Sequence, residues 1–279
     1  MMEEYCLVGK DVSRSPSPAM MNAAFAKLGI SARYTAVSIP ETEFAEEFSR
    51  LKRRELNGIN VTIPYKTKVI PMLDGLDAVS LRIQAVNTLE RQDGGYQGHN
   101  TDPDGIVAPL RRHMPDFEIS NALLIGAGGA ARAFCEAMNR MGCRDIAVAV
   151  REVPRGTRFI SAMERAFPRL NLSVTPVTDL RRVGHELIFN ASPIGSGGTP
   201  LPPEVRNAVH GTRVVFDAVY RPVETELLAA AKKEKCVVIY GREMLLDQGM
   251  AAFKIWTGLD APEEEMGRSL MDSLGGGAS

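Results

Sequence analysis

A glycine-rich segment in the middle of the chain limits the fold most. Gly126-Ala-Gly128-Gly129-Ala130-Ala131 follows the apolar run Ala122–Ile125 and opens an alanine-rich stretch that stops at Gly142. This is the G-x-G-x-x-G/A fingerprint: one glycine permits a tight turn, the next lets the backbone approach a pyrophosphate, and the third small residue lets helix and strand pack closely. The helix N-terminus then offers free N–H groups to phosphate. The alternative is a tight turn without a ligand, but the next apolar run, Ile146–Val150, favours a dinucleotide site.

The rest of the chain alternates apolar runs with helix-period segments, which predicts an α/β fold with mainly parallel strands. Glycine and proline mark several ends: Gly29 follows a helix, and Pro64 suits the first turn of another. In the first third we expect strands Tyr5–Gly9, Tyr34–Ile39 and Gly58–Thr62, helices Pro18–Leu28 and Glu41–Arg54, and a strand pair Ala85–Glu90 and Tyr96–His99. From Ala122 onward we expect strands Ala122–Ile125, Ile146–Val150, Leu172–Val174, Leu187–Asn190, Val214–Ala218 and Val237–Tyr240, which suit a doubly wound sheet.

The restart of this alternation at Ala122 predicts two domains with a cleft between them. The first takes residues 1–102 and is completed by C-terminal helices over residues 244–279, because the helix Met244–Trp256 has no strand after it to pair with. The second, residues 103–243, is the Rossmann-type nucleotide-binding domain, entered through a connecting helix at Pro103–Arg112.

Composition excludes several classes of protein. The 279 residues carry a formal net charge of -1, so no global field recruits nucleic acid or an anionic membrane. No apolar run approaches the roughly 18 residues that span a bilayer, and the acidic N-terminus does not resemble a signal peptide. The four cysteines form no C-x-x-C pair and have no histidine at ligand spacing, so we expect no metal site and a cytoplasmic protein.

The end of the second strand of the nucleotide domain selects the cofactor. An acidic residue there would bind the ribose 2′-hydroxyl of NAD, but Val150 and Arg151 occupy the position, with Arg155 four residues on. Two guanidinium groups can hold a 2′-phosphate through charge-assisted hydrogen bonds, which favours NADP. Glu152 could instead hold the ribose of NAD, so NAD is the alternative cofactor. The two arginines could also belong to a solvated surface loop.

Four polar segments stand out in the first domain, each where a strand ends or a helix begins. They are Ser15-Pro-Ser17-Pro, Asn60-Val-Thr62-Ile-Pro-Tyr-Lys66, Ala85-Val-Asn87-Thr and Asn100-Thr-Asp102. Together they offer hydroxyls, amides, one lysine and one carboxylate, and no arrangement of serine, histidine and aspartate for nucleophilic catalysis. This set suits a small ligand rich in hydroxyl groups with one acid group.

These segments, in this order, resemble the shikimate dehydrogenase family over nearly the whole chain. The family's Ser-x-Ser-Pro, Asn-Val-Thr-x-Pro-x-Lys, Ala-Val-Asn-Thr and Asn-Thr-Asp motifs match the four segments, and its nucleotide loop matches Gly126 to Arg132. Further matches are Asn190-Ala191-Ser-Pro-Ile-Gly195, Asp217 to Tyr220 with Pro222, and Gly241 to Met244 with Gln248.

The resemblance implies a role for each matched residue. Lys66 would be the catalytic acid/base and Asp102 its partner, although a lysine here could be an exposed helix residue and Asp102 a helix N-cap. Ser15 and Ser17 would hold the substrate carboxylate, and the ring hydroxyls would contact Asn60, Thr62, Asn87 and Gln248. The cofactor would contact Gly126, Gly128, Gly129, Ala130, Arg151, Arg155, Asn190, Ala191, Gly241 and Met244.

The implied reaction is NADP-dependent interconversion of 3-dehydroshikimate and shikimate by hydride transfer, in a monomer or a homodimer. Two alternatives stay open: a dehydrogenase of quinate or another cyclic polyol using NAD or NADP, and a ligand-sensing relative without catalysis. Four positions depart from the family pattern: Arg14 and Met21 stand where histidine is usual, Gln84 where glycine is usual, and Ser196 where methionine is usual. Of these, Arg14 and Gln84 are expected near the substrate.

Overall fold

The computed structural model describes residues 2–181 and 184–275. The chain divides into two compact units, Met1–Thr101 with Gln248–Ser279, and Asp102–Asp247. The sequence placed the divisions after residue 102 and before residue 244, so only Asp102 and residues 244–247 lie on the other side. One continuous helix, α9 (Gly241–Thr257), carries the chain from unit 2 back to unit 1.

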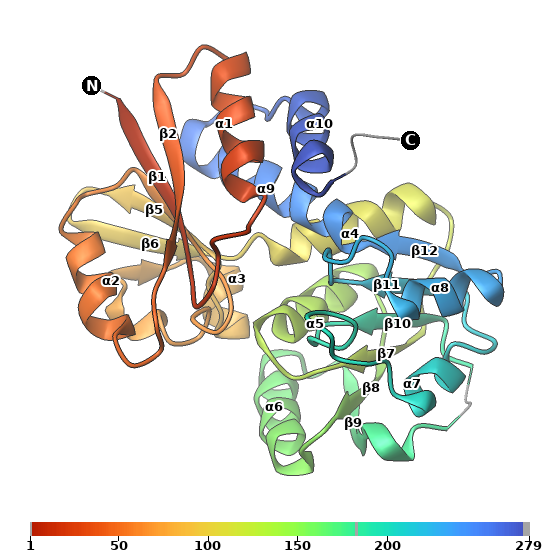
Figure 1. Ribbon diagram of the computed structural model, residues 1–279. Coiled ribbons are helices and arrows are strands. Elements are labelled where there is room, and N and C mark those ends of the chain that lie inside the picture. The colour runs from red at the N-terminus through yellow and green to blue at the C-terminus, as the bar shows by residue number, and fades with distance from the viewer. Residues whose placement is uncertain (1, 182–183, 276–279) are drawn as a thin grey trace. The chain divides into compact units, whose positions relative to one another are not determined.

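Unit 1 is built on a six-stranded mixed sheet in the order β2-β1-β3-β5-β6-β4. Four of these strands, β1, β2, β5 and β6, are labelled in Figure 1. Three parallel strands, β1 (Glu3–Gly9), β2 (Ala32–Ser38) and β3 (Gly58–Val61), form one half. The other half is the antiparallel hairpin β5 (Thr88–Gln92) and β6 (Gly95–His99), with the short β4 (Gly75–Leu76) beside β6. The ends of β3, β5 and β6 lie next to the predicted substrate segments.

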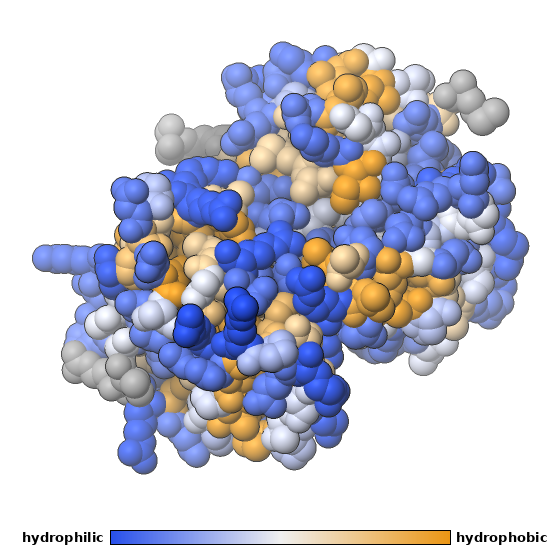
Figure 2. All heavy atoms as spheres, turned by 180° about the vertical axis from the view of Figure 1, so that it is seen from behind, coloured by the Kyte–Doolittle hydropathy of each residue, from blue (hydrophilic) through white to orange (hydrophobic). Residues whose placement is uncertain are grey.

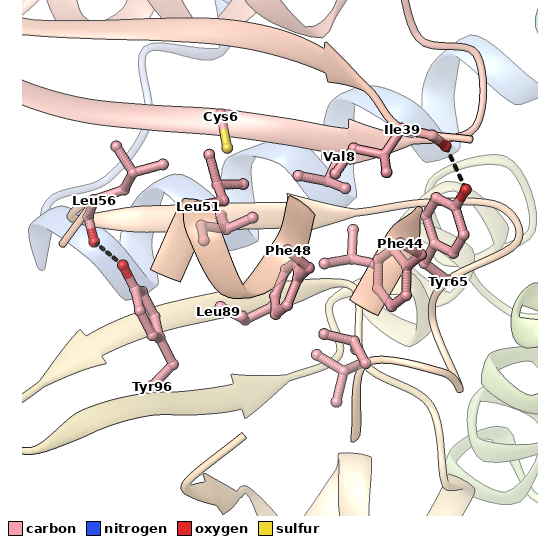
Figure 3. Packing of buried hydrophobic residues seen from close by; sticks show 14 residues of the cluster. Cys6, Val8, Ile39, Phe44, Phe48, Leu51, Leu56, Tyr65, Leu89 and Tyr96 are labelled. Carbon is pink, nitrogen blue, oxygen red and sulfur yellow. Dashed lines mark hydrogen bonds between the residues drawn. The ribbon is translucent and has the colours of Figure 1, made fainter. Parts of the chain in front are cut away.

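Helix α2 (Phe44–Lys52) covers one face of this sheet. Alternate residues of β1, Cys6 and Val8, point toward it and join a buried cluster that includes Phe48 and Tyr65 (Figure 3). Tyr96 and Tyr65 lie in the same cluster, and their hydroxyls donate to the backbone carbonyls of Leu56 and Ile39. Helix α3 (Ala78–Ile83) and the 3₁₀ turn η1 (Ile70–Met72) complete the part of the unit between β3 and β5.

Helices α1 (Ser17–Lys27) and α9 contribute aromatic side chains to the opposite face. Tyr5, which alternates with Cys6 on β1, stacks on Phe25 of α1 with ring centroids 5.0 Å apart and lies 4.9 Å from the ring of Trp256 of α9. The last helix, α10 (Glu263–Ser273), packs on α1 and buries Met266 and Leu270. The sequence had not predicted α10 separately, and it had placed the α9 helix correctly over Met244–Trp256.

Unit 2 is a parallel six-stranded sheet in the order β12-β11-β10-β7-β8-β9. This is the strand order of a dinucleotide-binding fold, with its reversal between β7 and β10. The strands are β7 (Asn121–Ile125), β8 (Asp145–Val150), β9 (Asn171–Pro176), β10 (Leu187–Asn190), β11 (Val214–Asp217) and β12 (Val237–Tyr240). The helices are α4 (Asp102–His113), α5 (Gly129–Met141), α6 (Val153–Ala166), α7 (Pro203–Ala208) and α8 (Glu226–Lys233), with a 3₁₀ turn η2 at Val177–Asp179. The predicted fold class is confirmed.

One local prediction is wrong. Pro64 does not begin a helix: residues 63–64 and 66–69 form turns, and the Ile63–Pro64 peptide bond is cis. The N–H of Tyr65 bonds to the carbonyl of Thr62, and that of Val69 to the carbonyl of Tyr65. The segment therefore presents Lys66 from a turn rather than from a helix face.

The hydropathy of the surface fits a chain in which 24% of the residues are charged. Figure 2 shows hydrophilic side chains over most of the face that it displays, with smaller hydrophobic areas between them. Within the described residues, no helix combines the length and the apolar character that crossing a membrane requires.

Candidate active site

Three of the predicted substrate residues, Asn60, Asn87 and Gln248, meet at the end of β3 and the start of β5. The side-chain amide of Asn87, 2% exposed, donates to Thr101 Oγ1 at 2.9 Å and to Gln248 Oε1 at 3.4 Å. Its oxygen accepts from the Thr101 N–H at 2.8 Å and from Thr88 Oγ1 at 2.9 Å. Residues far apart in the sequence, one of them on α9, are thus joined in one buried polar network.

Asn60 belongs to the same network. Its Nδ2 donates to the carbonyl of Asn87 at 3.1 Å and to Thr88 Oγ1 at 3.0 Å, while its Oδ1 accepts from the hydroxyl of Tyr34 at 2.7 Å. Sequence reasoning missed Tyr34, Thr88 and Thr101. Thr88 and Thr101 lie inside the quoted motifs and could have been found there, whereas Tyr34 lies in a strand with no polar motif.

The two serines come together at the start of α1. Ser15 Oγ and Ser17 Oγ are 3.2 Å apart, and Ser15 Oγ also accepts from the Ser17 N–H at 3.3 Å. Ser17 is buried and Ser15 is half-buried. Adjacent hydroxyls are suited to donate to the two oxygens of a carboxylate.

Thr62 and Lys66 are placed by close backbone packing. A Cβ at Gly9 would lie 2.6 Å from Thr62 Cγ2, so glycine at the end of β1 lets the Asn60–Lys66 segment approach it. The carbonyl of Lys66 accepts from the Val86 N–H at 2.7 Å, which ties the Lys66 turn to the segment that carries Asn87. The Lys66 side chain is half-buried. Asp102 is 2% exposed and is the first residue of α4 in unit 2.

In unit 2 the glycine loop has the geometry that the fingerprint requires. Gly126 has φ +109°, and a Cβ there would lie 3.0 Å from the carbonyl oxygen of Ala191, so the loop and the segment after β10 approach closely. Gly128 caps α5, and nothing lies within 4 Å of where its Cβ would be. The open space beside Gly128 and the N–H groups at the start of α5 fit a pyrophosphate.

Asn190 shapes the segment after β10 from a fully buried position. Its Nδ2 donates to the Ile194 carbonyl at 3.0 Å and to Asp217 Oδ1 at 2.9 Å, and its Oδ1 accepts from the N–H and the hydroxyl of Ser192 at 3.1 and 2.7 Å. Both donors and both lone pairs are therefore used within the protein. A cofactor contact in this segment would come from the main chain, including that of Ala191.

Asp217 links this segment to the start of α8. Its carboxylate accepts from Thr225 Oγ1 at 2.6 Å and from the Val219 N–H at 3.0 Å, besides Asn190. Burial raises the pKa of Asp217 to about 6, although these three hydrogen bonds act to lower it. The Asp217 side chain therefore has a structural role, because it connects the end of β10 to the start of α8.

The predicted cofactor-selecting residues lie at the start of α6. Arg151, Glu152 and Arg155 are all exposed, and Glu152 is the residue before the helix, with no side-chain hydrogen bond to its N–H groups. Gly156 lets α6 pack on the sheet, since a Cβ there would lie 2.5 Å from Val174 Cγ2. At the start of α9, a Cβ at Gly241 would lie 2.6 Å from the Ala218 and Val219 carbonyl oxygens. Met244 is buried one turn later.

The departures from the family pattern have separate structural settings. Gln84 is exposed and ends α3 in the left-handed conformation, φ +51° and ψ +48°, with its Nε2 bonded to the Leu81 carbonyl at 2.7 Å. Glycine would suit this backbone better, so Gln84 is a conformational departure. Met21 is 1% exposed and part of the core, whereas Arg14 is exposed. Ser196 lies in a turn, where its N–H donates to the Pro193 carbonyl.

Two family models match the chain. Residues 7–89 match the shikimate dehydrogenase substrate binding domain, and residues 241–271 match the shikimate 5′-dehydrogenase C-terminal domain. A shikimate dehydrogenase (NADP(+)) of Nitrosopumilus maritimus is 34% identical over 97% of this chain and 99% of its own length. The chain belongs to the shikimate dehydrogenase family.

Solved structures agree with this membership. A crystal structure of shikimate dehydrogenase in complex with NADP⁺ superimposes with a TM-score of 0.89 at 32% identity, covering 98% of this chain and 96% of that one. The quinate dehydrogenase of Corynebacterium glutamicum in complex with NAD has a TM-score of 0.88 at 26% identity, covering 97% and 99%. Related structures of this fold are therefore named for different substrates and different cofactors.

Proposed function

We propose that this chain is an NADP-dependent oxidoreductase that interconverts 3-dehydroshikimate and shikimate. The observation that carries the proposal is the buried polar network of Asn60, Asn87, Thr101 and Gln248 in unit 1, in a chain whose second unit has the glycine loop of a dinucleotide site. Unit 1 would bind the substrate and unit 2 the cofactor. The N. maritimus relative, named for NADP, supports the same assignment.

NADP⁺, when bound, would accept the hydride from the ring carbon. The chain must then take the hydroxyl proton, and we assign this step to Lys66, with Asp102 as its partner and a contact of the same hydroxyl. In the reductive direction the charged Lys66 ammonium donates the proton to the forming alkoxide. A positioned acid/base of this kind contributes about 10²–10⁴-fold to the rate.

Ser15 and Ser17 would bind the substrate carboxylate. Their hydroxyls lie 3.2 Å apart, a spacing at which each can donate to one oxygen of a planar carboxylate. Quinate carries a further hydroxyl on the saturated, puckered ring carbon beside the carboxylate, and two serines that fit the flat carboxylate of shikimate leave no spare room for it. Burying that extra hydroxyl without a partner would weaken binding, so we favour shikimate.

For the cofactor, Arg151 and Arg155 would hold the 2′-phosphate of NADP. Both are exposed at the start of α6, directly after β8, where the ribose of a dinucleotide lies in this fold. Gly126, Gly128, Gly129 and Ala130 would contact the pyrophosphate through the main chain, and Gly241 and Met244 would line the nicotinamide site.

The test is a four-way assay of shikimate and quinate, each with saturating NADP⁺ and NAD⁺. We expect the highest kcat/KM for shikimate with NADP⁺. The second candidate, a quinate dehydrogenase using NAD, is favoured by the C. glutamicum structure and by the Glu152 carboxylate near the cofactor-selecting position. A higher kcat/KM for quinate, or for NAD⁺, would replace the proposed substrate or cofactor accordingly.

A further inference from the structure

Tyr34 reaches across the sheet of unit 1 to a predicted substrate residue. It lies on β2, the edge strand, and β1 separates β2 from β3. Its side chain is 2% exposed, and its hydroxyl nevertheless donates to Asn60 Oδ1 on β3 at 2.7 Å. A phenol buried this deeply needs a partner for its hydroxyl, and here that partner belongs to the substrate network.

The hydrogen bonds of Asn60 fix the orientation of its amide. The Asn87 carbonyl can only accept, so the atom facing it at 3.1 Å must be Nδ2, whose second proton goes to Thr88 Oγ1. Oδ1 therefore faces Tyr34 and accepts its proton. One lone pair of Oδ1 remains, so Asn60 can accept one hydrogen bond from a substrate hydroxyl and has no proton to donate.

Tyr34 itself is held firmly. Asn22 of α1 clamps its backbone on both sides, with Nδ2 donating to the Tyr34 carbonyl at 2.9 Å and Oδ1 accepting from the Tyr34 N–H at 2.8 Å. The ring lies 6.1 Å from that of Trp256 on α9. Burial raises the pKa of Tyr34 well above its usual value, so the hydroxyl stays protonated and remains a donor.

We propose that Tyr34 is a positioning residue for the substrate: its hydroxyl holds Asn60 Oδ1 in place and, through the Asn60 amide, positions the Asn87 carbonyl and the Thr88 hydroxyl at the start of β5. Asn22 then ties this arrangement to α1, the helix that begins at Ser17. The expected effect of Tyr34 on KM rests on the proposed function. Its expected effect on the Asn60 side chain does not.

The kinetic test compares Tyr34→Phe with Tyr96→Phe. Both tyrosines are buried, and each donates one hydrogen bond, at 2.7 Å to Asn60 and at 2.8 Å to the Leu56 carbonyl. Tyr96 lies in the cluster under α2 (Figure 3), so its variant is matched for the loss of one buried hydroxyl. We expect similar losses of stability, but a roughly tenfold rise in KM for shikimate for Tyr34→Phe alone, with KM for NADP⁺ unchanged.

A second measurement keeps the test independent of the substrate. In amide NMR spectra the Asn60 side-chain protons, assigned by their absence in Asn60→Asp, should be protected from exchange in the wild type and in Tyr96→Phe, and exchange faster in Tyr34→Phe. Equal KM values in the two phenylalanine variants, or unchanged Asn60 protection, would overturn the positioning role. If the wild type turns over no shikimate, the proposed function fails, and the NMR result alone decides the role of Tyr34.

Discussion

Replacing Gly58 with alanine should loosen α9 from unit 1. A Cβ at Gly58 would lie 2.3 Å from Trp256 Nε1 and 2.4 Å from its Cε2, far inside contact distance. Trp256 Nε1 also donates to the Leu89 carbonyl at 2.9 Å. The added methyl group must therefore displace the indole ring and break its hydrogen bond.

The magnitude follows from three contributions to the free energy of unfolding. Forcing a methyl group into a packed contact costs about 1–3 kcal/mol, and leaving the Leu89 carbonyl without its donor costs about 1–3 kcal/mol more. Gly58 does not have a positive φ, so alanine would otherwise stabilise the chain by roughly 0.4–1 kcal/mol through the unfolded state. The expected net destabilisation is about 3 kcal/mol, within a range of about 1–6 kcal/mol.

The assay is urea unfolding followed by fluorescence and by far-UV circular dichroism. Trp256 is the only tryptophan, so its fluorescence reports on this contact directly. With a dependence of about 2 kcal/mol per molar urea, the midpoint should fall by roughly 1–2 M. Gln248 lies about two turns before Trp256 on α9, so KM for shikimate should rise as well.

The control is a double-mutant cycle with Trp256→Leu, followed by circular dichroism. Without the indole, Gly58→Ala should be neutral or slightly stabilising. An equal cost in both backgrounds would show that the clash with Trp256 is not the cause and would refute the reasoning.

Four further outcomes are expected. Lys66→Ala should lower kcat by about 10²–10⁴-fold with little change in KM for shikimate, since proton transfer matters chiefly in the transition state; the exposed neighbour Lys68→Ala is the control, and near-normal kcat in the Lys66 variant would remove Lys66 from the chemistry. Arg151→Ala should raise KM for NADP⁺ far more than for NAD⁺, and equal rises would contradict its role. Gln84→Gly should stabilise the chain by about 1 kcal/mol in urea unfolding, because it relieves a left-handed backbone; destabilisation would count against this. Because the pKa of Asp217 is raised from 3.8 to about 6, the folded state binds its proton more tightly, so stability should fall as pH rises from about 4 to 6 and then level off; a slope that persists in Asp217→Asn would assign it to another group.

Much of unit 2 could be predicted because its signals are local. The glycine loop, the apolar strands and the stop at Gly142 each depend on a few neighbouring residues, and together they indicate a doubly wound, mainly parallel sheet, which the structure has. The cis bond before Pro64 could not be predicted, because a trans proline at the start of a helix has the same sequence pattern. Helix α10 was not predicted separately within the C-terminal helices, since its burial of Met266 and Leu270 depends on α1, far away in the sequence.

The predicted site residues show a different limit. The motifs predict which residues serve the site, but not whether a side chain contacts a ligand or supports one that does. That distinction depends on hydrogen-bond capacity, which is visible only in the folded chain. Asn190 uses all its donors and lone pairs inside unit 2, and Asn60 keeps a single lone pair because Tyr34, Asn87 and Thr88 take the rest.

The hydrogen-bonding capacity of Asn60 limits which ring hydroxyl of the substrate it could bind. If Asn60 can only accept, then a substrate hydroxyl must donate to it, and a ring position that carries a keto oxygen would place two acceptors against each other. Asn60 would therefore contact a ring carbon that stays a hydroxyl in both oxidation states, while the carbon that is oxidised lies beside a donor such as the Lys66 ammonium. The Asn87 carbonyl sets this polarity, and Tyr34 on β2 takes one lone pair of Oδ1, so the choice of which hydroxyl reacts would depend partly on a residue outside every recognised motif.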